Sequence, residues 1–238
     1  MGLYVGLFGF LSFRKFISFE YRDFDLAVHA QSVFGILHGS LNSSILGIPF
    51  LGNHFVPILF LVAPLYVLFP SPLLLLWLQT GLLGGGAFFV FRLASRVHRN
   101  LALPLSLAYL LYPAVGFVNL FEFHPVAFAP FFLLGTFDAF ERKAFKTFLI
   151  FLLLALSCQE DVSLVIVMIG VYALLKRRSL RFSLVPLGLG IGWFWMSVFC
   201  LMPRWNPGTI HFPMLYSPLG KSLLEVFTFI LTHPLKTF

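Results

Sequence analysis

Apolar runs recur along the chain at lengths that suit helices inside a membrane. About 20 residues of α-helix are needed to cross the hydrocarbon core of a bilayer. The runs cover residues 72–91, 101–118, 126–140, 147–158, 162–175, 182–202 and 223–231. Polar and basic turns separate them. This pattern predicts an all-α fold, a polytopic transmembrane helical bundle.

Basic side chains between the runs indicate the orientation of the bundle. They form three clusters: Arg92, Arg96 and Arg99, then Arg142, Lys143 and Lys146, and then Lys176, Arg177, Arg178 and Arg181. Positively charged loops stay on the cytoplasmic side of a membrane. Because two apolar runs separate successive clusters, one alternating path places all three in the cytoplasm. The sequence therefore predicts a multi-pass protein of the cell inner (plasma) membrane.

The segment of residues 18–71 is expected outside, and it mixes polar and aromatic residues. Within it, residues 24–37 have apolar positions at helical spacing, which predicts an amphipathic helix lying on the membrane. Residues 56–69 are apolar but short and interrupted by Pro64, which predicts either a second interfacial helix or half of a hairpin. Residues 1–13 are expected to end a first span, and residues 72–238 to form the bundle. Residues 1–238 are thus predicted to be a single membrane domain, a fragment of a longer protein.

Composition narrows the class of protein. The chain is 59% hydrophobic and 11% charged, which is far from the average of soluble domains. The net charge of +7 arises mostly from the basic turns, so we expect membrane lipid as a partner and no nucleic acid. Three consecutive glycines, residues 84–86, fall inside an apolar run and predict close helix packing instead of a phosphate loop. Cys158 and Cys200 have no metal-site spacing and are expected to pack as free cysteines, with a disulfide as the alternative.

Glu160 and Asp161 are adjacent carboxylates inside the apolar stretch of residues 147–175. An ionised side chain at membrane depth costs about 2.5–3.5 kcal/mol on insertion scales. The preceding run would form only about 18 Å of helix, so the turn is expected below the outer surface, in a protein-lined cavity. Neighbouring helical side chains diverge by about 100°. We expect one carboxylate to face the cavity and the other to cap a helix or pair with His124; a hydrated outer loop is the alternative.

Further acids and histidines fall on the same predicted face: Asp23, Asp25, His54, Glu122 and His124. Taken singly, they suit helix caps and hydrated turns. Taken together, they predict a site in which a carboxylate acts as a general base or oxygen ligands hold a divalent cation. If a metal is present, the expected ligands are Asp25, His124 and Glu160. The basic residues Arg22, Arg204 and Lys221 are expected to bind a lipid phosphate. Asp138 and Glu141, at the inner end, are expected to pair with Arg142 and Lys143.

Short motifs in this region resemble a bacterial and archaeal family of predicted membrane proteins with a domain of unknown function, which is grouped with the GT-C polytopic glycosyltransferases. The motifs are Phe24-Asp25-Leu26 with Gln31, Asn53-His54-Phe55 with Pro57, Pro64-Leu65-Tyr66, Phe123-His124-Pro125 and Glu160-Asp161. They occur in family order between residues 21 and 176. The chain lacks the paired acids that GT-C enzymes carry at the first outer loop, and it lacks the long C-terminal part of typical members.

The resemblance implies a GT-C-like membrane enzyme that takes a sugar from a polyprenyl-phosphate donor on the extracytoplasmic face. It assigns catalysis to Asp25, with Asp23 as the alternative, together with Glu160 and His124. Substrate binding is expected from the remaining site residues: Asp23, His54, Glu122, Asp161, Arg22 and Arg204. A membrane transporter or proton-coupled carrier, in which Glu160 and Asp161 titrate, is one alternative. A non-catalytic membrane assembly subunit is the other.

Overall fold

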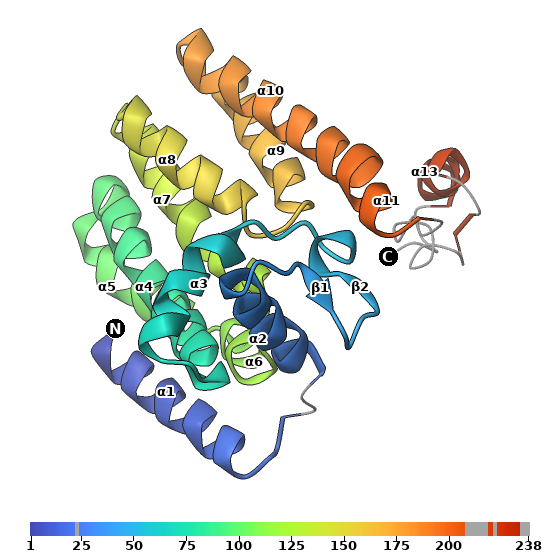
Figure 1. Cartoon of the computed structure of the whole chain (residues 1–238). Helices are drawn as coiled ribbons and strands as arrows, with labels where there is room; N and C mark the ends of the chain where they lie inside the picture. Colours follow the sequence, from blue (N-terminus) through green and yellow to red (C-terminus); the bar gives the residue numbers. More distant parts are fainter. Residues whose placement is uncertain (22–23, 208–218, 221–222, 234–238) are drawn as a thin grey trace.

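The computed structural model describes residues 1–21, 24–207, 219–220 and 223–233. The described chain is almost entirely helical, which confirms the all-α prediction (Figure 1). The first elements are α1 (Gly2–Ile17), α2 (Phe24–Leu37), β1 (Asn42–Ser43), β2 (Ile48–Pro49), the 3-10 helix η1 (Phe50–Gly52), α3 (Ile58–Leu68) and α4 (Pro72–Val97). There follow η2 (Arg99–Leu101), α5 (Ala102–Leu111), α6 (Pro113–Leu120), η3 (Pro125–Phe128), α7 (Ala129–Glu141) and α8 (Phe145–Leu156). The last are α9 (Val162–Leu175), α10 (Leu180–Trp195), the π-helical η4 (Met196–Leu201), α11 (Met202–Trp205) and α13 (Leu223–Thr232).

Helix α4 is the packing centre of the first half of the chain, and its three consecutive glycines make this arrangement possible. A Cβ atom on Gly84 would meet Tyr4 and Val5 of α1, at 3.0 and 2.9 Å. A Cβ on Gly85 would meet a ring carbon of α7 at 3.0 Å, and one on Gly86 would overlap Tyr109 of α5. Each glycine therefore admits a different neighbouring helix. The predicted role of these glycines in close helix packing is confirmed.

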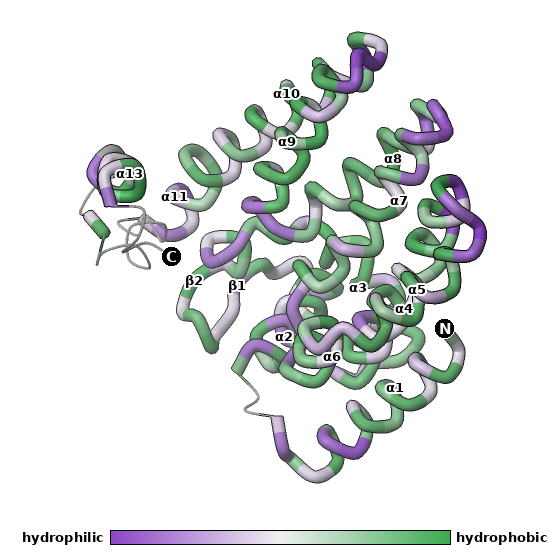
Figure 2. The backbone as a smooth tube through the Cα atoms, turned by 180° about the vertical axis from the view of Figure 1, so that it is seen from behind, coloured by the Kyte–Doolittle hydropathy of each residue, from purple (hydrophilic) through white to green (hydrophobic). Residues whose placement is uncertain are grey.

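Two helical hairpins, α7–α8 and α9–α10, extend the bundle beyond α4 (Figure 1). The turns α4–α5, α7–α8 and α9–α10 carry the basic clusters, and Figure 2 shows them as hydrophilic tips along one edge of the molecule. We call this side the basic edge. The acids and histidines described below lie at the opposite ends of these helices. The two kinds of polar residue are thus separated by the length of the apolar helices, as the sequence predicts.

Few of the helices are long enough to cross a membrane. By length and composition, the described residues contain two candidate spans, Pro72–Val97 and Leu180–Trp205. The bent pair Arg99–Leu111 and Pro113–Leu120, with an angle of 43° at its break, makes a third if it is one span. The other expected crossings correspond to α7, α8, α9 and α13, which have 13, 12, 14 and 10 residues. The expected succession of full-length crossings is therefore not found, because these apolar runs form helices shorter than the roughly 20 residues that a crossing needs.

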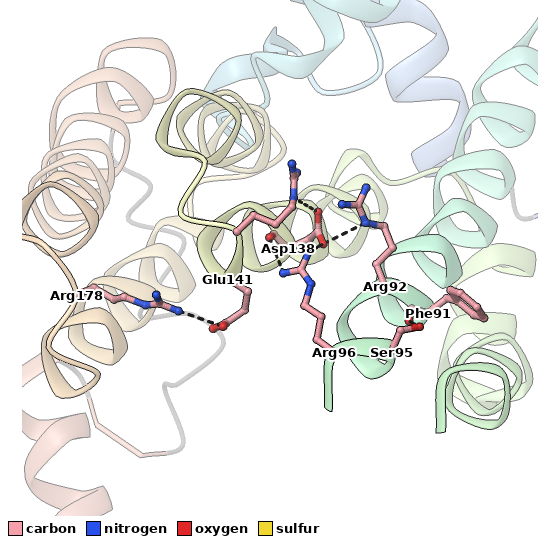
Figure 3. Close-up of polar contacts among 8 residues, drawn as sticks. Phe91, Arg92, Ser95, Arg96, Asp138, Glu141 and Arg178 are labelled. Carbon is pink, nitrogen blue, oxygen red and sulfur yellow. Dashed lines mark hydrogen bonds and ion pairs between the residues drawn. The ribbon is translucent and has the colours of Figure 1, made fainter. Parts of the chain in front are cut away.

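One buried carboxylate organises the basic edge (Figure 3). Asp138 of α7 is fully buried, with ion pairs to Arg96 at 2.8 Å, Arg142 at 2.9 Å and Arg92 at 3.4 Å. Glu141 instead pairs with Arg178 of the neighbouring hairpin at 3.1 Å. Asp138 was expected to pair with Arg142, which is confirmed, but no ion pair among the described residues involves Lys143. Arg92 and Arg96 of α4 pair with Asp138 instead, because they lie one helical turn apart and face α7.

The outer segment folds back onto the bundle. Helix α2 has the predicted bounds and buries one face, including Leu26 and Val33. It packs against α3, and the start of α3 is tied to the end of α8 by a bond from the Ile58 backbone N–H to the Ser157 carbonyl, 2.8 Å. The β1–β2 hairpin follows α2. Both cysteines are free, as expected; Cys158 packs in the core, whereas Cys200 is exposed and does not.

Candidate functional site

An aspartate and a histidine from different helical units meet near the start of α2. His124 Nε2 lies 3.1 Å from Asp25 Oδ2, close enough for the ring N–H to donate to the carboxylate. The side chains are 33% and 36% exposed, so a ligand has access to both. Phe121 stacks on the His124 ring, with the ring planes 21° apart. A histidine held by a carboxylate and reachable from outside is suited to accept a proton.

A second histidine–carboxylate pair joins the outer segment to the α8–α9 turn. His54 Nδ1 lies 2.8 Å from Glu160 Oε1, and the Phe55 backbone N–H donates to Glu160 Oε2 at 2.9 Å. Glu160 is 9% exposed, whereas the His54 side chain is 44% exposed. Both carboxylate oxygens of Glu160 are therefore occupied by donors from one short segment. The expected pairing of this turn with His124 is wrong among the described residues, because Glu160 binds His54 and His124 binds Asp25.

A third histidine, His29, lies beside His124. His29 of α2 is 8% exposed, and its ring meets those of Phe123 and His124 edge-on, with centroids 5.5 and 6.4 Å apart. Its Nδ1 atom has no hydrogen-bond partner among the described residues. Burial, and the nearby charges of His124 and His54, lower the pKa of His29 to about 3. His29 is therefore neutral at physiological pH.

Glu122 has a structural task at this site. One of its carboxylate oxygens, Oε2, accepts the backbone N–H groups of Asp25 at 2.8 Å and Leu26 at 3.0 Å. These are unpaired donors of the first turn of α2, and the positive end of the helix dipole favours a carboxylate there. Glu122 is 3% exposed. These bonds give Glu122 a positioning role, because they hold the backbone of Asp25 in place. Its expected role in substrate binding stays a prediction.

A glutamine inside α4 fixes the turn that carries His124. Gln79 is fully buried, and its Oε1 accepts the His124 backbone N–H at 3.0 Å. Its amide group donates to the carbonyls of Val118, Asn119 and Glu122 at 3.0, 3.4 and 3.1 Å. One side chain thus satisfies four backbone groups of the α6–η3 turn. The backbone of the turn is thereby held against α4, independently of the side chains that it presents.

Nearby charges shift the pKa values of two groups at these pairs. Burial acts to lower the pKa of His54, but the hydrogen bond and charge of Glu160, with the charges of Asp161 and Asp25, outweigh it and raise the pKa. The pKa of Asp161 is raised by partial burial and by the neighbouring Glu160 carboxylate. The structure thus pairs Asp25 with His124 and His54 with Glu160, and the charge of Asp25 also acts on His54. That all four residues line one cavity stays a prediction.

An apolar groove of about 500 Å³ lies between α1 and α6. Phe8, Phe117 and Phe121 are among its walls, and Lys15 is the single charged residue in its lining. The Lys15 ammonium donates to the Leu120 carbonyl at 2.7 Å and lies 4.4 Å above the Tyr21 ring. Phe121 links the groove to the Asp25–His124 pair, because its ring lines the groove and stacks on His124. This geometry suits an apolar chain with an anionic end.

Comparison with known proteins places the chain in a family. A family model described as "Predicted membrane protein (DUF2079)" matches residues 15–238. The chain belongs to this family. A comparison of the DUF2079 chain with curated proteins finds no match, and neither does a comparison with solved structures. The match covers all of the site and all but the first helical turns of the fold.

Some expected site residues of this DUF2079 protein are not placed at the pairs. Arg22, Asp23 and Lys221 lie outside the described residues. Arg204 is exposed at the end of α11, which packs against η1 near His54. Asp161 caps no helix through its side chain. Among the described residues, no three His, Cys, Asp or Glu side chains are arranged to hold a metal ion, so Asp25, His124 and Glu160 do not form a ligand set.

Sequence reasoning missed three residues of the DUF2079 site: Lys15, His29 and Gln79. His29 interrupts the apolar spacing of residues 24–37, and Gln79 is the amide in an apolar run of α4. A polar group that interrupts an apolar helix must find a partner or a function, because its burial is costly. That rule identifies both residues as candidates. Lys15 has no such signal, since a basic residue at a helix end is ordinary.

Proposed function

We propose that this chain is a multi-pass protein of the plasma membrane with a GT-C-like arrangement, and that it transfers a sugar from a polyprenyl phosphate to a hydroxyl acceptor on the extracytoplasmic face. The basic edge would face the cytoplasm. The observation that carries the proposal is the Asp25–His124 pair, which is accessible and adjoins an apolar groove. A proton acceptor and a lipid-shaped groove together suit a reaction of a lipid-linked donor with a polar acceptor.

The proposed step needs one proton acceptor. The acceptor hydroxyl oxygen forms a bond to the anomeric carbon of the sugar, while the bond from that carbon to the phosphate oxygen breaks. The hydroxyl proton moves to the Asp25–His124 pair, and polyprenyl phosphate leaves with the bonding electrons. General base catalysis of this kind contributes about 10²–10⁴-fold. His54 and Glu160 would hold the opposite wall of the site, where their mutual bond fixes both side chains.

The groove between α1 and α6 supports a lipid-linked donor. Its aromatic walls suit an isoprenoid chain, and the Lys15 ammonium at its end suits the phosphate. The ammonium has a carbonyl and an aromatic face as its partners, so its charge is not neutralised by a carboxylate among the described residues. A phosphate at this point would place the anomeric carbon near His124, which stacks on Phe121 of the same groove.

A donor-turnover assay tests the proposal. The full chain, reconstituted in vesicles, is given polyprenyl-phosphate hexoses and pentoses, and the release of polyprenyl phosphate is measured. Asp25→Asn should lower turnover about 10²–10⁴-fold. It should leave the fold intact, because Glu122 binds the backbone and not the side chain of residue 25. Glu20→Gln, which removes an exposed acid of the same segment, should keep the wild-type rate. The proposed enzymatic function would be refuted if Asp25→Asn turned over the donor at the wild-type rate, or if the wild type showed no turnover.

A proton-coupled carrier is the second candidate, and His29 favours it. Its Nδ1 atom is buried without a hydrogen-bond partner among the described residues, its ring contacts His124, and the charge of His54 acts on it. A relay requires such a chain of groups. A carrier would acidify or alkalise vesicles when a solute gradient is applied, and Glu160→Gln would stop this. If neither donor turnover nor proton movement occurs, an assembly subunit is the remaining explanation.

A further inference from the structure

The basic edge contains a groove that is unrelated to the acid–histidine site. It has a volume of about 850 Å³ and lies between the turns of the hairpins α7–α8 and α9–α10. Its charged lining consists of Glu141, Lys143, Lys176, Arg177, Arg178 and Arg181. We call it the basic groove. Five cations and one carboxylate share this space, so it has a strong excess of positive charge.

Most of this charge is available to a ligand. Glu141 pairs with Arg178 at 3.1 Å, as Figure 3 shows, and the Arg178 guanidinium also lies over the Phe140 ring at 4.7 Å. Among the described residues, no ion pair involves the other four cations. Lys176 and Arg181 are held only over aromatic faces, at 5.6 and 5.2 Å from the Tyr172 and Phe145 rings. The one carboxylate of the groove, Glu141, pairs with Arg178, so the other four cations repel each other and an anionic ligand would relieve this repulsion.

The backbone gives a second, independent observation. Lys143 and Arg177 have φ angles of 57° and 50°, in the left-handed region. Each lies two residues after the last residue of a helix, Lys143 after α7 and Arg177 after α9. Glycine is the usual residue there, because a side chain in this conformation costs about 1 kcal/mol. Both turns instead carry a cation, and both cations line the same groove. Two separate turns thus keep a strained backbone conformation, and the side chains of both strained residues line the basic groove. Backbone strain of this kind is concentrated at functional sites.

The surroundings of the groove indicate what kind of anion it takes. Leu175 and Leu180, which flank the basic run of the α9–α10 turn, are 78% and 67% exposed. Val97, which lines the groove, is 82% exposed. Apolar side chains exposed beside a cluster of cations suit the boundary between acyl chains and headgroups. We infer that the basic groove binds the phosphate headgroup of an anionic membrane lipid, with the acyl chains lying on the exposed leucines.

Lipid competition tests this inference on the full chain. The protein is purified in micelles that contain equal amounts of phosphatidylglycerol and phosphatidylcholine, and native mass spectrometry counts each retained lipid. The wild type should retain phosphatidylglycerol preferentially. Lys176→Gln/Arg177→Gln should weaken this preference at least about tenfold, since each interfacial cation contributes about 1 kcal/mol. Arg99→Gln/Lys146→Gln removes one lysine and one arginine from the same edge but outside the groove, and it should keep the preference.

A glycine variant separates binding from folding. Arg177→Gly relieves the left-handed strain and should raise the melting temperature while it lowers the preference for phosphatidylglycerol. Phe19→Gly relieves the same strain at φ 53° far from the groove, and should raise the melting temperature alone. The inference fails if the wild type shows no preference, or if the two double variants lose it equally. It also fails if millimolar inorganic phosphate displaces the retained lipid, which would make free phosphate the ligand.

Discussion

His54 Nδ1 lies 2.8 Å from Glu160 Oε1, and the two residues are 106 positions apart in the sequence. The bond ties the outer segment to the α8–α9 turn, and the Phe55 backbone N–H reinforces it on the second carboxylate oxygen. Neither partner is placed by its own helix, since each lies in a connection between elements. The wall of the site is thus made by a contact between two loops, and its strength depends on the charge of both.

The first prediction concerns the pH dependence of this contact. The pKa of His54 is raised in the folded state, so the charged pair stabilises the fold fully below about pH 6.5. The contribution is lost as pH rises through the higher folded-state pKa. The melting temperature of the wild type should exceed that of His54→Gln by about 2–4 °C at pH 6, and the gap should narrow towards pH 9. A gap that widens with pH would contradict the assignment.

The second prediction has the opposite sign and concerns His29. Its folded pKa is about 3, so below about pH 6.5 the unfolded chain binds a proton that the folded protein does not. Stability should therefore fall between pH 6.5 and 3. His29→Leu removes this dependence, and it leaves no hydrogen-bond partner of Nδ1 behind. The variant should match the wild type at pH 8 and exceed its melting temperature by several degrees at pH 4.5. Parallel curves would show that His29 is solvated.

The third prediction tests the glutamine in α4. Gln79→Leu has nearly the same volume but leaves four backbone groups of the α6–η3 turn without their partner. The cost should be about 2–4 kcal/mol, since each orphaned buried group costs about 1–3 kcal/mol and the turn can relax towards water. Gln31→Leu, the matched control, removes bonds to the exposed Ser44 and the buried Ser43, and should cost about 1 kcal/mol. Equal losses, measured by denaturant unfolding in mild detergent, would disprove the proposed support of His124.

The fourth prediction concerns the glycines of α4. Gly86→Ala would drive a methyl group into Tyr109, which also bonds the Leu83 carbonyl at 2.9 Å. The expected destabilisation is about 1–3 kcal/mol. Gly81→Ala lies in the same helix with open space around it, and should stabilise by about 0.5–1 kcal/mol through its better helix propensity. Opposite signs for the same substitution at positions five residues apart would establish the close contact with α5.

The sequence predicted more of the helices than of their contacts. The bounds of α2 and the role of the glycines at residues 84–86 follow from local spacing, and so does the segregation of basic turns from acids and histidines. The partner of Glu160 does not, since two neighbouring turns offered histidines and only the folded chain decides between them. The capping by Glu122 is equally hidden, because the Asp25 N–H that donates to its carboxylate lies 97 residues earlier in the chain. The sequence also predicted more full-length crossings than the described helices provide, since apolar composition continues through caps and turns.

The His54–Glu160 bond has a consequence for biosynthesis. A ribosome delivers residue 54 to the membrane long before residue 160 exists, so His54 has no Glu160 to bind while the six helices α3 to α8 are made. The same holds for Asp25, which meets His124 only after about a hundred more residues have been translated. Each pair closes in turn, first at His124 and then at Glu160. Both acid–histidine pairs can therefore form only after the α8–α9 turn, which carries Glu160, has left the ribosome.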